Sequence, residues 1–493
     1  MVWLGVDAGT SLVKTVAFDD DGSEVRVSRR EVPIERPRPG FSEQDPEAVW
    51  DAVADTVREV GEAVDEPVGL LAVTGQGDGC WFADEDGEPH GSAILWNDAR
   101  GRPIIEEWRR SGLLDETFRV NGSVPFPGAQ CGILPWLREH DPDRLERVGT
   151  VAYAIDLVRA RLTGQMFTDE SNASVPFFDI RARVYSDEVL RAYGLEWARD
   201  LLPEVRRPEE EALALQAAAA ERLGLPEGLP VSVGPFDIAA TAIGIGAIHD
   251  GQAASILGTT LCNEVVIDDV DTDGEPSGLH VCEGVPGRWL RAFASMSGTD
   301  SVGWLQGALG VDDPAELSRM AADVEPGADG LLVLPYLSPA GERAPFLDPA
   351  ARGTVFGLSL EHTRAHLARA FLEGLTFVIA DCLSRSATKP TELRVSGGGA
   401  ASDFWCQMIA DVADVPVIRY EGEEFGARGA LMAGLVASGE ATGFDEAVER
   451  FVRPRDGFEP DADRRDRYAP LFEQFLALRE TAAQSWSRLA GRE

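Results

Sequence analysis

The sequence predicts an α/β protein built from two related domains, and three observations support this prediction. The chain has 493 residues, of which 44% are apolar, which is enough for full-sized hydrophobic cores. Short apolar strands alternate with amphipathic helices along the chain, as in α/β folds. A strand, a Gly-Thr turn and a returning strand occur around Gly9-Thr10 and again around Gly258-Thr259. This weak repeat favours a duplicated domain with a boundary near residues 247–252, although two unrelated β-turns would look the same.

The first 75 residues are expected to form a hairpin-rich sheet and one helix. Apolar runs separated by Gly-containing turns predict three antiparallel strands at 2–7, 13–18 and 24–32. Apolar residues at helical spacing predict a helix over about 46–63, and the apolar run 68–73 predicts the next strand.

The second half has the same character. Helical spacing predicts helices over 315–324, 364–386 and 428–438, and a final helix from about 464. A strand at 393–395 runs into SGGGAAS and then a helix to about 413. The Ala-rich stretch 213–221 is also interpreted as a helix.

The charge balance argues against several partners. The chain has 45 Lys and Arg against 84 Asp and Glu, a net charge of −39, and its lysines are Lys14 and Lys389. Such an acidic surface repels phosphate backbones and anionic lipids, so we expect no nucleic-acid or membrane partner. An acidic tail is excluded because carboxylates occur along the whole chain. An acidic partner surface stays open, but adaptation to a high-salt cytosol is favoured, because molar salt screens repulsion beyond about 3 Å.

The sequence also indicates where the protein works. Its N-terminus lacks the basic start of a signal peptide. The longest apolar stretch, 231–248, is rich in Gly and interrupted by Asp237, which makes it a poor membrane span. The six cysteines form no CxxC pair, so neither a disulfide framework nor a zinc site is indicated. We therefore expect a cytoplasmic protein.

The two Gly-Thr turns are candidate phosphate sites. A glycine in a tight turn lets backbone N–H groups approach an anion, and a threonine adds a hydroxyl. Beside the first turn, Asp7 could hold Mg²⁺ through water and Lys14 could face a phosphate. A plain hairpin with an exposed lysine is the alternative. The second turn, Gly258-Thr259-Thr260, is of the same kind.

A third glycine-rich segment, SGGGAAS at 396–402, follows a predicted strand and precedes a predicted helix. Three glycines there can cradle a nucleotide at a helix N-terminus. The spacing is not GxGxxG, so no Rossmann dinucleotide site is indicated. A merely tight strand-to-helix turn is the alternative.

Polar residues among apolar runs suggest a base and a sugar site. Asp237 is a lone carboxylate in an apolar, Gly-rich segment, which fits either a helix N-cap or a general base. Gln76, Asp78, Trp96 and Asp98 each follow an apolar strand. Carboxylates, an amide and an indole plane suit a sugar or polyol, with solvated loops as the alternative.

Five segments occur along the chain in the order LGVDAGTSLVKTVAFD, GPFDIAATAIGIGA, LGTT, VSGGGAASDFWCQMIADVADVPV and EEFGARGALMAG. Together they resemble the FGGY carbohydrate kinases, which share the actin, hexokinase and Hsp70-ATPase (ribonuclease H-like) fold. LGVDAGTSLVKTVAFD resembles the first phosphate loop of the family, and GPFDIAATAIGIGA its catalytic-Asp segment. LGTT resembles the second phosphate loop, VSGGGAASDFWCQMIADVADVPV the adenosine-binding signature, and EEFGARGALMAG the helix after it.

The resemblance implies two domains with an interdomain cleft, and transfer of the γ-phosphoryl group of ATP, with Mg²⁺, to a sugar hydroxyl. Residues 1–247 would hold the sugar site and first phosphate loop, and residues 248–493 the nucleotide site and a helical tail from about 464. The implied roles are Asp237 as base and sugar contact, and Asp7 as the carboxylate near magnesium. Further roles are phosphate binding by Gly9, Thr10, Lys14, Gly258, Thr259 and Thr260; nucleotide binding by Gly398, Gly399, Ala400 and Ser402; and sugar binding by Gln76, Asp78, Trp96 and Asp98.

The departures from the family pattern lie on the sugar side. Xylulokinases usually read GQMHG where this chain has GQGDG, and often GDN where it has Phe236-Asp237-Ile238. Ile133 stands three residues before Trp136, where the family has a lysine. GQGDG, DAGTS and TDESNAS resemble the branch with L-xylulose and erythritol kinases.

A pentulose of the xylulose type is therefore the expected substrate, with an erythritol- or glycerol-type polyol as the alternative. A sugar-independent ATPase of the same fold and a catalytically inactive sugar sensor are the rivals from other classes. The oligomeric state stays open, with a homodimer as one option.

Overall fold

The computed structural model describes residues 1–207 and 212–490, and it divides into two compact units. Unit 1 contains residues 1–248, 268–290 and 424–452, and unit 2 contains 249–267, 291–423 and 453–490. The chain thus returns to unit 1 twice after it has entered unit 2. The predicted single boundary after residue 247 does not include these two returning segments.

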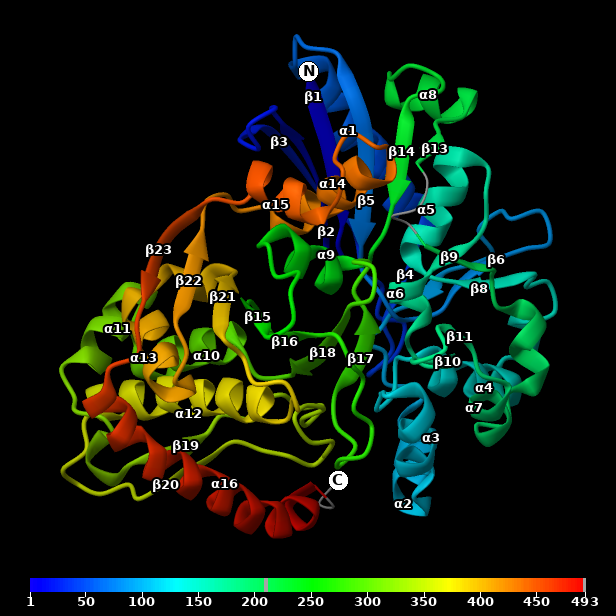
Figure 1. The fold of residues 1–493 in the computed structure, drawn as a ribbon. Coiled ribbons are helices and arrows are strands. Elements are labelled where there is room, and N and C mark those ends of the chain that lie inside the picture. Colours follow the sequence, from blue (N-terminus) through cyan, green and yellow to red (C-terminus); the bar gives the residue numbers. More distant parts are fainter. Residues whose placement is uncertain (208–211, 491–493) are drawn as a thin grey trace. The chain divides into compact units, whose positions relative to one another are not determined.

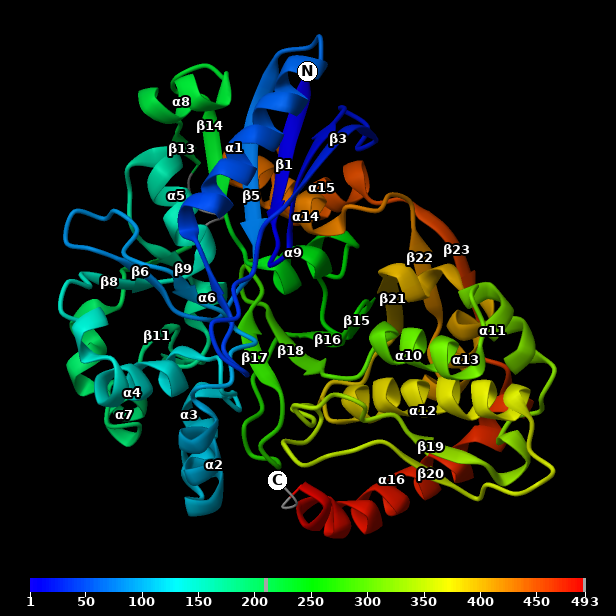
Figure 2. The same ribbon diagram turned by 180° about the vertical axis from the view of Figure 1, so that it is seen from behind.

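Unit 1 is built on a six-stranded mixed sheet (Figures 1 and 2). Its order is β13 (Leu213–Ala214), β14 (Pro230–Val233), β5 (Val68–Gly75), β1 (Val2–Ala8), β2 (Leu12–Phe18) and β3 (Glu24–Glu31). Antiparallel pairing of β1 with β2 and of β2 with β3 confirms the expected three-stranded meander. β5 pairs parallel with both β1 and β14. The loops that follow β1, β5 and β14 therefore share one edge of the sheet.

Helices pack against this sheet at close range. α1 (Pro46–Ala63) packs on β2 and β3 with its valines buried, and Asp45 caps its first turn. α9 (Asp237–Gly244) packs against α14 (Phe425–Ala437), which also contacts β1 and β5. A β-carbon on Gly429 would lie 1.7 Å from the carbonyl oxygen of Ala240, so the two helix backbones nearly touch.

Shorter elements complete unit 1. They are β4 (Glu43–Gln44), β6 (Trp81–Ala83), β7 (Ala93–Ile94), α2 (Arg102–Ser111), α3 (Leu113–Asn121), α4 (Gln130–His140), η1 (Pro142–Arg144), β8 (Thr150–Ala152), α5 (Ala154–Thr163), β9 (Thr168–Asp169), α6 (Glu170–Ala173), β10 (Phe178–Asp179), β11 (Val184–Tyr185), α7 (Asp187–Ala192), η2 (Glu196–Leu201), β12 (Val205–Arg206), α8 (Ala217–Leu223), β17 (Leu279–Cys282) and α15 (Phe444–Phe451).

Unit 2 has its own sheet, in which the hairpin pattern recurs. The order runs from β18 (Trp289–Ser295), whose last five residues belong to this unit, through β16 (Leu261–Ile267), β15 (Gln252–Leu257), β21 (Glu392–Ser396), β22 (Val417–Tyr420) and β23 (Pro454–Phe458). β15 pairs antiparallel with β16 and parallel with β21. This repeats the arrangement of β1 between β2 and β5, as the duplication hypothesis predicts.

Helices also surround the sheet of unit 2 (Figure 1). α12 (Arg364–Ser384) packs against β16, and the C-terminal α16 (Ala462–Ala490) packs against α12 and α13. The remaining elements are α10 (Thr299–Leu309), α11 (Pro314–Ala322), η3 (Ala328–Gly330), β19 (Leu332–Leu334), β20 (Thr354–Phe356), η4 (Gly398–Ala401) and α13 (Asp403–Ala413).

One predicted element is partly wrong. The Ala-rich stretch 213–221 begins as strand β13, and helix α8 starts only at Ala217. Leu213 pairs with Val231 at the edge of the sheet, so strand pairing overrides the local helix propensity of alanine.

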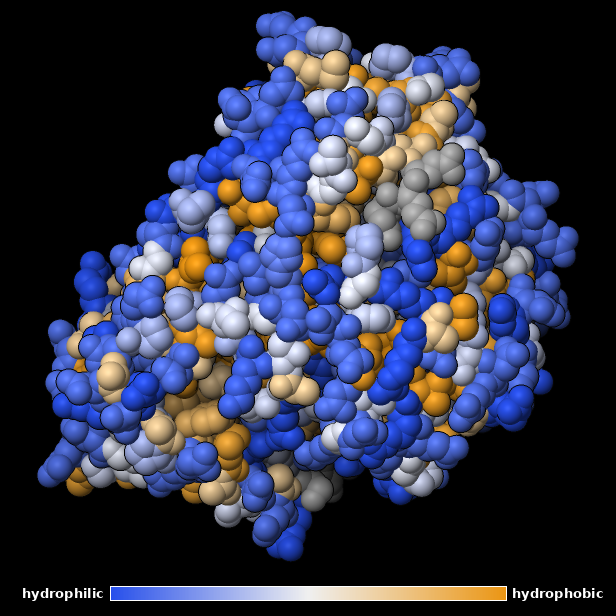
Figure 3. All heavy atoms as spheres, in the orientation of Figure 1, coloured by the Kyte–Doolittle hydropathy of each residue, from blue (hydrophilic) through white to orange (hydrophobic). Residues whose placement is uncertain are grey.

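The surface drawn in Figure 3 is mostly hydrophilic, with apolar residues in scattered patches. In the parts of the chain that the structure describes, no helix combines the length and apolar character needed to span a membrane.

Candidate active site

The first Gly-Thr turn connects β1 and β2 and has Asp7 at its start. Asp7 lies opposite Lys14 in the strand register. Its Oδ1 is buried and has no hydrogen-bond partner among the described residues. Burial raises the pKa of Asp7, the Lys14 ammonium lowers it, and the Glu424 carboxylate raises it. A buried carboxylate oxygen without a donor is a candidate cation contact, because an unpaired buried charge is costly.

Lys14 does not point freely at the turn. Its Nζ pairs with Glu424 Oε2 at 2.8 Å, and Arg29 pairs with the other oxygen of Glu424 at 2.7 Å. The Glu424 side chain is only 5% exposed. The lysine therefore fastens the residue before α14 to the first hairpin, and its contact with a phosphate stays a prediction.

Asp237 is the first residue of α9 and follows β14 after a three-residue loop. Its Oδ1 accepts the N–H of Ile238 at 2.7 Å. Burial, with added repulsion from Asp7 and Asp78, raises its pKa to about 8. The three predicted carboxylates are therefore electrostatic neighbours in unit 1. A carboxyl group with a pKa near neutrality can exchange a proton with a bound hydroxyl.

The loop after β5 carries Gln76 and Asp78. Gln76 Nε2 donates to Gln44 Oε1 at 2.9 Å, while its buried Oε1 lacks a partner within the described chain. Asp78 has a left-handed backbone with φ of 55°. A β-carbon on Gly77 would lie 2.3 Å from the Phe236 ring, so the two departures from the xylulokinase pattern pack against each other. Gly77 makes room for Phe236 beside Asp237.

Trp96 and Asp98 lie in one loop but have different surroundings. Trp96 Nε1 donates to Thr10 Oγ1 at 3.0 Å, which joins the predicted sugar loop to the first predicted phosphate turn. Asp98 is buried, and both its oxygens accept hydrogen bonds from Arg100; Oδ2 also accepts the N–H of Ser42. These bonds let Asp98 support the loop, and the predicted sugar contact of Asp98 stays a prediction.

The second Gly-Thr turn, in unit 2, connects β15 and β16. The N–H groups of Thr299 and Asp300, at the start of α10, donate to the carbonyl oxygens of Gly258 and Thr259 at 2.8 and 3.3 Å. The Thr259 side chain is exposed and Thr260 is half-buried. The backbone carbonyl oxygens of this turn are used to hold it in place. Its hydroxyl and N–H groups are the groups that a phosphate would need.

The glycine-rich loop lies beside this turn at the end of the neighbouring parallel strand. Gly397 has φ of 85°, and a β-carbon on it would lie 2.8 Å from the carbonyl oxygen of Leu257. Around Gly398 nothing lies within 4 Å of such a β-carbon, so that residue borders open space. Ala400 is buried, and Ser402 caps α13 by accepting the N–H of Trp405 at 3.2 Å. The predicted second phosphate turn and nucleotide loop thus share one edge of unit 2.

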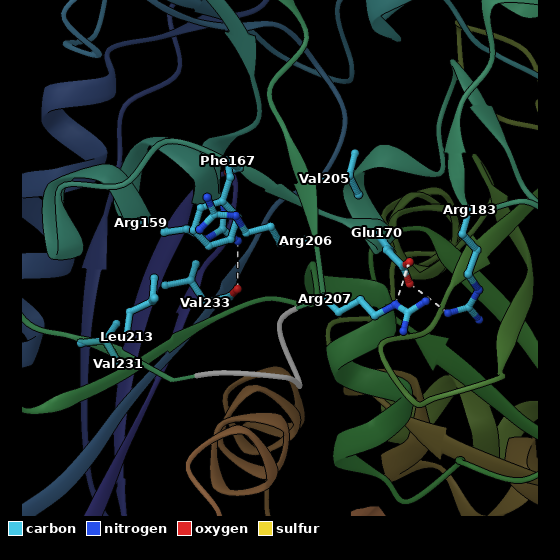
Figure 4. Close-up of a pocket in the computed structure, with 10 residues that line it drawn as sticks. All are labelled: Arg159, Phe167, Glu170, Arg183, Val205, Arg206, Arg207, Leu213, Val231 and Val233. Carbon is cyan, nitrogen blue, oxygen red and sulfur yellow. Dashed lines mark hydrogen bonds and ion pairs between the residues drawn. The ribbon is translucent and has the colours of Figure 1, made fainter.

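A separate cavity of about 360 Å³ lies in unit 1 (Figure 4). Arginines and apolar residues line it, and Glu170 pairs there with Arg183 and Arg207. None of the predicted site residues lines this cavity.

Sequence reasoning missed several supporting residues. Gln44 donates to the Thr10 carbonyl oxygen at 2.8 Å and accepts from Gln76, so it connects two predicted loops. Glu424 and Arg100 hold Lys14 and Asp98. No local sequence pattern predicts these contacts. Gln44 and Glu424 lie far along the chain from the residues they support, and the pair of Arg100 with Asp98 looks like any pair of opposite charges.

Two α/β units, each with a Gly-Thr hairpin turn at its sheet, agree with the actin-like fold expected from the sequence. The FGGY carbohydrate-kinase N-terminal domain matches residues 2–244, and its C-terminal domain matches residues 253–438. The chain belongs to the FGGY family of carbohydrate kinases and is an ATP-dependent carbohydrate kinase.

Individual relatives agree with this assignment. The chain is 31% identical to an erythritol kinase of Brucella abortus, across 99% of this chain and 97% of that protein. It is 30% identical to a xylulose kinase of Escherichia coli, across 97% and 98%. A crystal structure of a ligand-bound xylulose kinase from Lactobacillus acidophilus has the same fold, with a TM-score of 0.93, 23% identity and 99% coverage of both chains.

Proposed function

We propose that the enzyme phosphorylates a hydroxyl of a pentulose of the xylulose type, with an erythritol- or glycerol-type polyol as the second candidate. The position of Asp237 carries this proposal, because a carboxyl group with a raised pKa stands at a helix start beside Asp7 and the Gln76–Asp78 loop. The names of relatives support both substrate classes, since they include xylulose kinases and an erythritol kinase.

In the proposed reaction, Asp237 accepts the proton of the attacking hydroxyl. The new bond joins that oxygen to the γ-phosphorus, while the bond between this phosphorus and the bridging oxygen breaks and ADP leaves. Gln76, Asp78 and Trp96 orient the sugar, and Thr10, Thr259 and their glycines contact the phosphates. Positioning and charge neutralisation supply most of the rate enhancement in such a transfer.

Asp7 fits a magnesium contact as a single carboxylate with an unpartnered oxygen. The described residues contain no group of three metal-ligating side chains, and Mg²⁺ typically uses one or two carboxylates with waters and substrate phosphates. When bound, the ion would neutralise charge on the transferred phosphoryl group. Asp7 would hold it at the end of β1.

On the nucleotide side, we propose that Gly398, Gly399 and Ala400 contact ATP through their backbone at the start of α13. Ser402 supports that contact as the helix cap, since its hydroxyl already accepts the N–H of Trp405 and lies 3.0 Å from the Ser318 hydroxyl. We further propose that the enzyme works in the cytoplasm, where ATP is made and used. We also propose a homodimer, which light scattering at several protein concentrations would test.

A coupled ADP-release screen tests the substrate. D- and L-xylulose, ribulose, erythritol, ribitol, xylitol and glycerol would be compared at 0.1 M and at molar KCl, because a net charge of −39 favours activity in salt. We expect a ketopentose to give the highest kcat/KM. A tetritol or glycerol at the top would select the polyol alternative, and turnover independent of any acceptor would contradict sugar phosphorylation.

A further inference from the structure

The TDESNAS segment is a buried structure that the proposed reaction has not used so far. It forms strand β9 and the one-turn helix α6, and Asp169 caps that helix by accepting the N–H groups of Ser171 and Asn172. Ser171 is 2% exposed. Its hydroxyl is therefore available only to neighbouring protein groups.

Ser171 has a neighbour on each side of its hydroxyl. Its Oγ accepts the backbone N–H of Phe236 at 3.0 Å, and its O–H donates to Asp169 Oδ1. Phe236 is the N-cap of α9, directly before Asp237. The hydroxyl thus joins α6 to the residue directly before the proposed base.

The rest of the loop between β14 and α9 is also fixed. Gly234 N–H donates to the Val73 carbonyl oxygen at 2.8 Å, and Thr74 Oγ1 donates to the Pro235 carbonyl oxygen at 2.7 Å. These two bonds hold the loop at its β5 side. The bond from Phe236 to Ser171 holds the peptide next to Asp237, so it acts where the direction of the catalytic side chain is set.

Buried charges hold Ser171 in turn. Arg159 pairs with Asp156 at 2.7 Å and with Asp169 at 3.6 Å. It also donates to the Val233 carbonyl oxygen at 2.9 Å, the bond drawn in Figure 4. Asp169 Oδ2 accepts from the Asn172 side chain at 3.0 Å. Hydrogen bonds in a low-dielectric interior polarise one another, so the fixed Asp169 orients the serine hydroxyl.

We propose that Ser171 is a positioning residue for phosphoryl transfer, acting through the Phe236 amide on the orientation of Asp237. This inference rests on the proposed role of Asp237 as the base. Loss of the hydroxyl leaves the Phe236 N–H without its acceptor and lets the start of α9 shift. Small displacements of a reacting group slow the chemical step strongly, so kcat falls while ATP binding at unit 2 stays intact.

The chain offers a matched control in Ser174. Its hydroxyl is also buried, donates to the Glu170 carbonyl oxygen at 2.6 Å and accepts the N–H of Cys282 at 2.9 Å. It makes no hydrogen bond to the 234–236 loop in those contacts. Ser171→Ala and Ser174→Ala therefore remove the same group from the same short segment.

We expect Ser171→Ala to lower kcat about tenfold with little change in the KM for ATP, and Ser174→Ala to stay within about twofold of wild type. Equal kcat values for the two variants, at matched thermal stability, would overturn the proposal. If Ser171→Ala does not fold, Ser171→Thr and Ser171→Val replace it. This pair differs by one hydroxyl, and kcat higher in Thr than in Val is expected, whereas equal values count against the proposal.

A double-mutant cycle separates this inference from the proposed function. In an Asp237→Asn background, Ser171→Ala should cause no further loss of kcat, since the group that it positions is already disabled. Additive losses would show that Ser171 acts by another route. Normal turnover of Asp237→Asn alone would instead remove the proposed base, whatever Ser171→Ala does.

Discussion

The two Gly-Thr turns have the same backbone pattern but are held by different kinds of contact. In unit 1, side chains hold the turn: Trp96 donates to the Thr10 hydroxyl and Gln44 to the Thr10 carbonyl oxygen. In unit 2, the backbone of α10 holds the turn through the carbonyl oxygens of Gly258 and Thr259. The first turn is therefore connected to the predicted sugar loops, whereas the second is hydrogen-bonded to the N-terminus of α10.

Charge separates the two turns as well. Beside the first lie Asp7 and Asp237, whose pKa values are both raised by burial. Beside the second, Asp300 is exposed in the first turn of α10. The same hairpin pattern therefore has buried carboxylates with raised pKa values beside it in unit 1 and an exposed aspartate beside it in unit 2. This difference predicts that substitutions at the two turns have distinct kinetic signatures.

The largest expected effect is on turnover in Asp237→Asn. Loss of a general base lowers kcat by about 10²- to 10⁴-fold, while the amide keeps the size of the side chain. Asp300→Asn, the counterpart beside the second turn, should retain near-normal kcat. Steady-state kinetics with the best acceptor measures kcat for both variants. An equal fall of kcat in the two variants would contradict the proposed difference between the two turns.

Gly298→Ala should disturb the second turn alone. A β-carbon there would lie 2.4 Å from the Thr259 carbonyl oxygen, so the turn must shift. We expect the KM for ATP to rise about tenfold with a smaller change in the sugar KM, on the scale of one or two lost hydrogen bonds. Gly303→Ala on the same helix is the control, because nothing lies near its β-carbon position. A rise confined to the sugar KM would contradict this assignment.

Trp96→Phe should show the coupling at the first turn. The ring stays but the bond to Thr10 Oγ1 is lost, and one such bond contributes about 0.5–1.5 kcal/mol, or roughly 2- to 10-fold. Because Trp96 lies in the predicted sugar loop and bonds to the predicted phosphate turn, we expect kcat/KM to fall for both substrates. Thr10→Ser keeps the hydroxyl and should be milder. An effect on sugar alone would show that the bond does not couple the two loops.

The smallest expected effect is on stability as a function of pH. The folded pKa of Asp237 is about 8, above its ordinary value of 3.8, so its contribution to stability is lost as pH rises toward 8. Asp237→Asn lacks this titration and should therefore gain on wild type between pH 6 and 8, by about 2–4 °C in Tm. Thermal melts of both proteins with EDTA present measure this difference in Tm. A difference in Tm that stays constant from pH 6 to 8 would contradict the raised pKa of Asp237.

Local sequence patterns predicted strands and helices well where the spacing of apolar residues matches the period of the element. The hairpin at 2–18, the inward valines of α1 and the position of Asp237 at a helix start all follow from short-range alternation and helical spacing. The sequence likewise predicted the turns at Gly9 and Gly258 and the loop at 396–402, because turns need particular residue types.

Partners distant in the chain could not be predicted in the same way. Arg29 meets Glu424 across 395 residues, and Lys14 meets the same carboxylate. Periodicity tells which side chains face inward but not what they meet there. For the same reason the hydrogen bonds that Arg100 and Ser42 donate to Asp98 could not be predicted, and a sugar contact at Asp98 stays a prediction.

The close packing of α9 against α14 bears on the order in which the protein is made. Arg428 donates to the Gly244 carbonyl oxygen across 184 residues, and a β-carbon on Gly426 would lie 3.2 Å from the Asp7 carboxylate. A ribosome therefore releases the helix carrying Asp237 long before it releases the helix that covers it. Until residues 425–437 emerge, the growing chain lacks the helix that packs beside Asp7 and α9, so we expect a nascent or truncated N-terminal half to lack the complete surroundings of the proposed base.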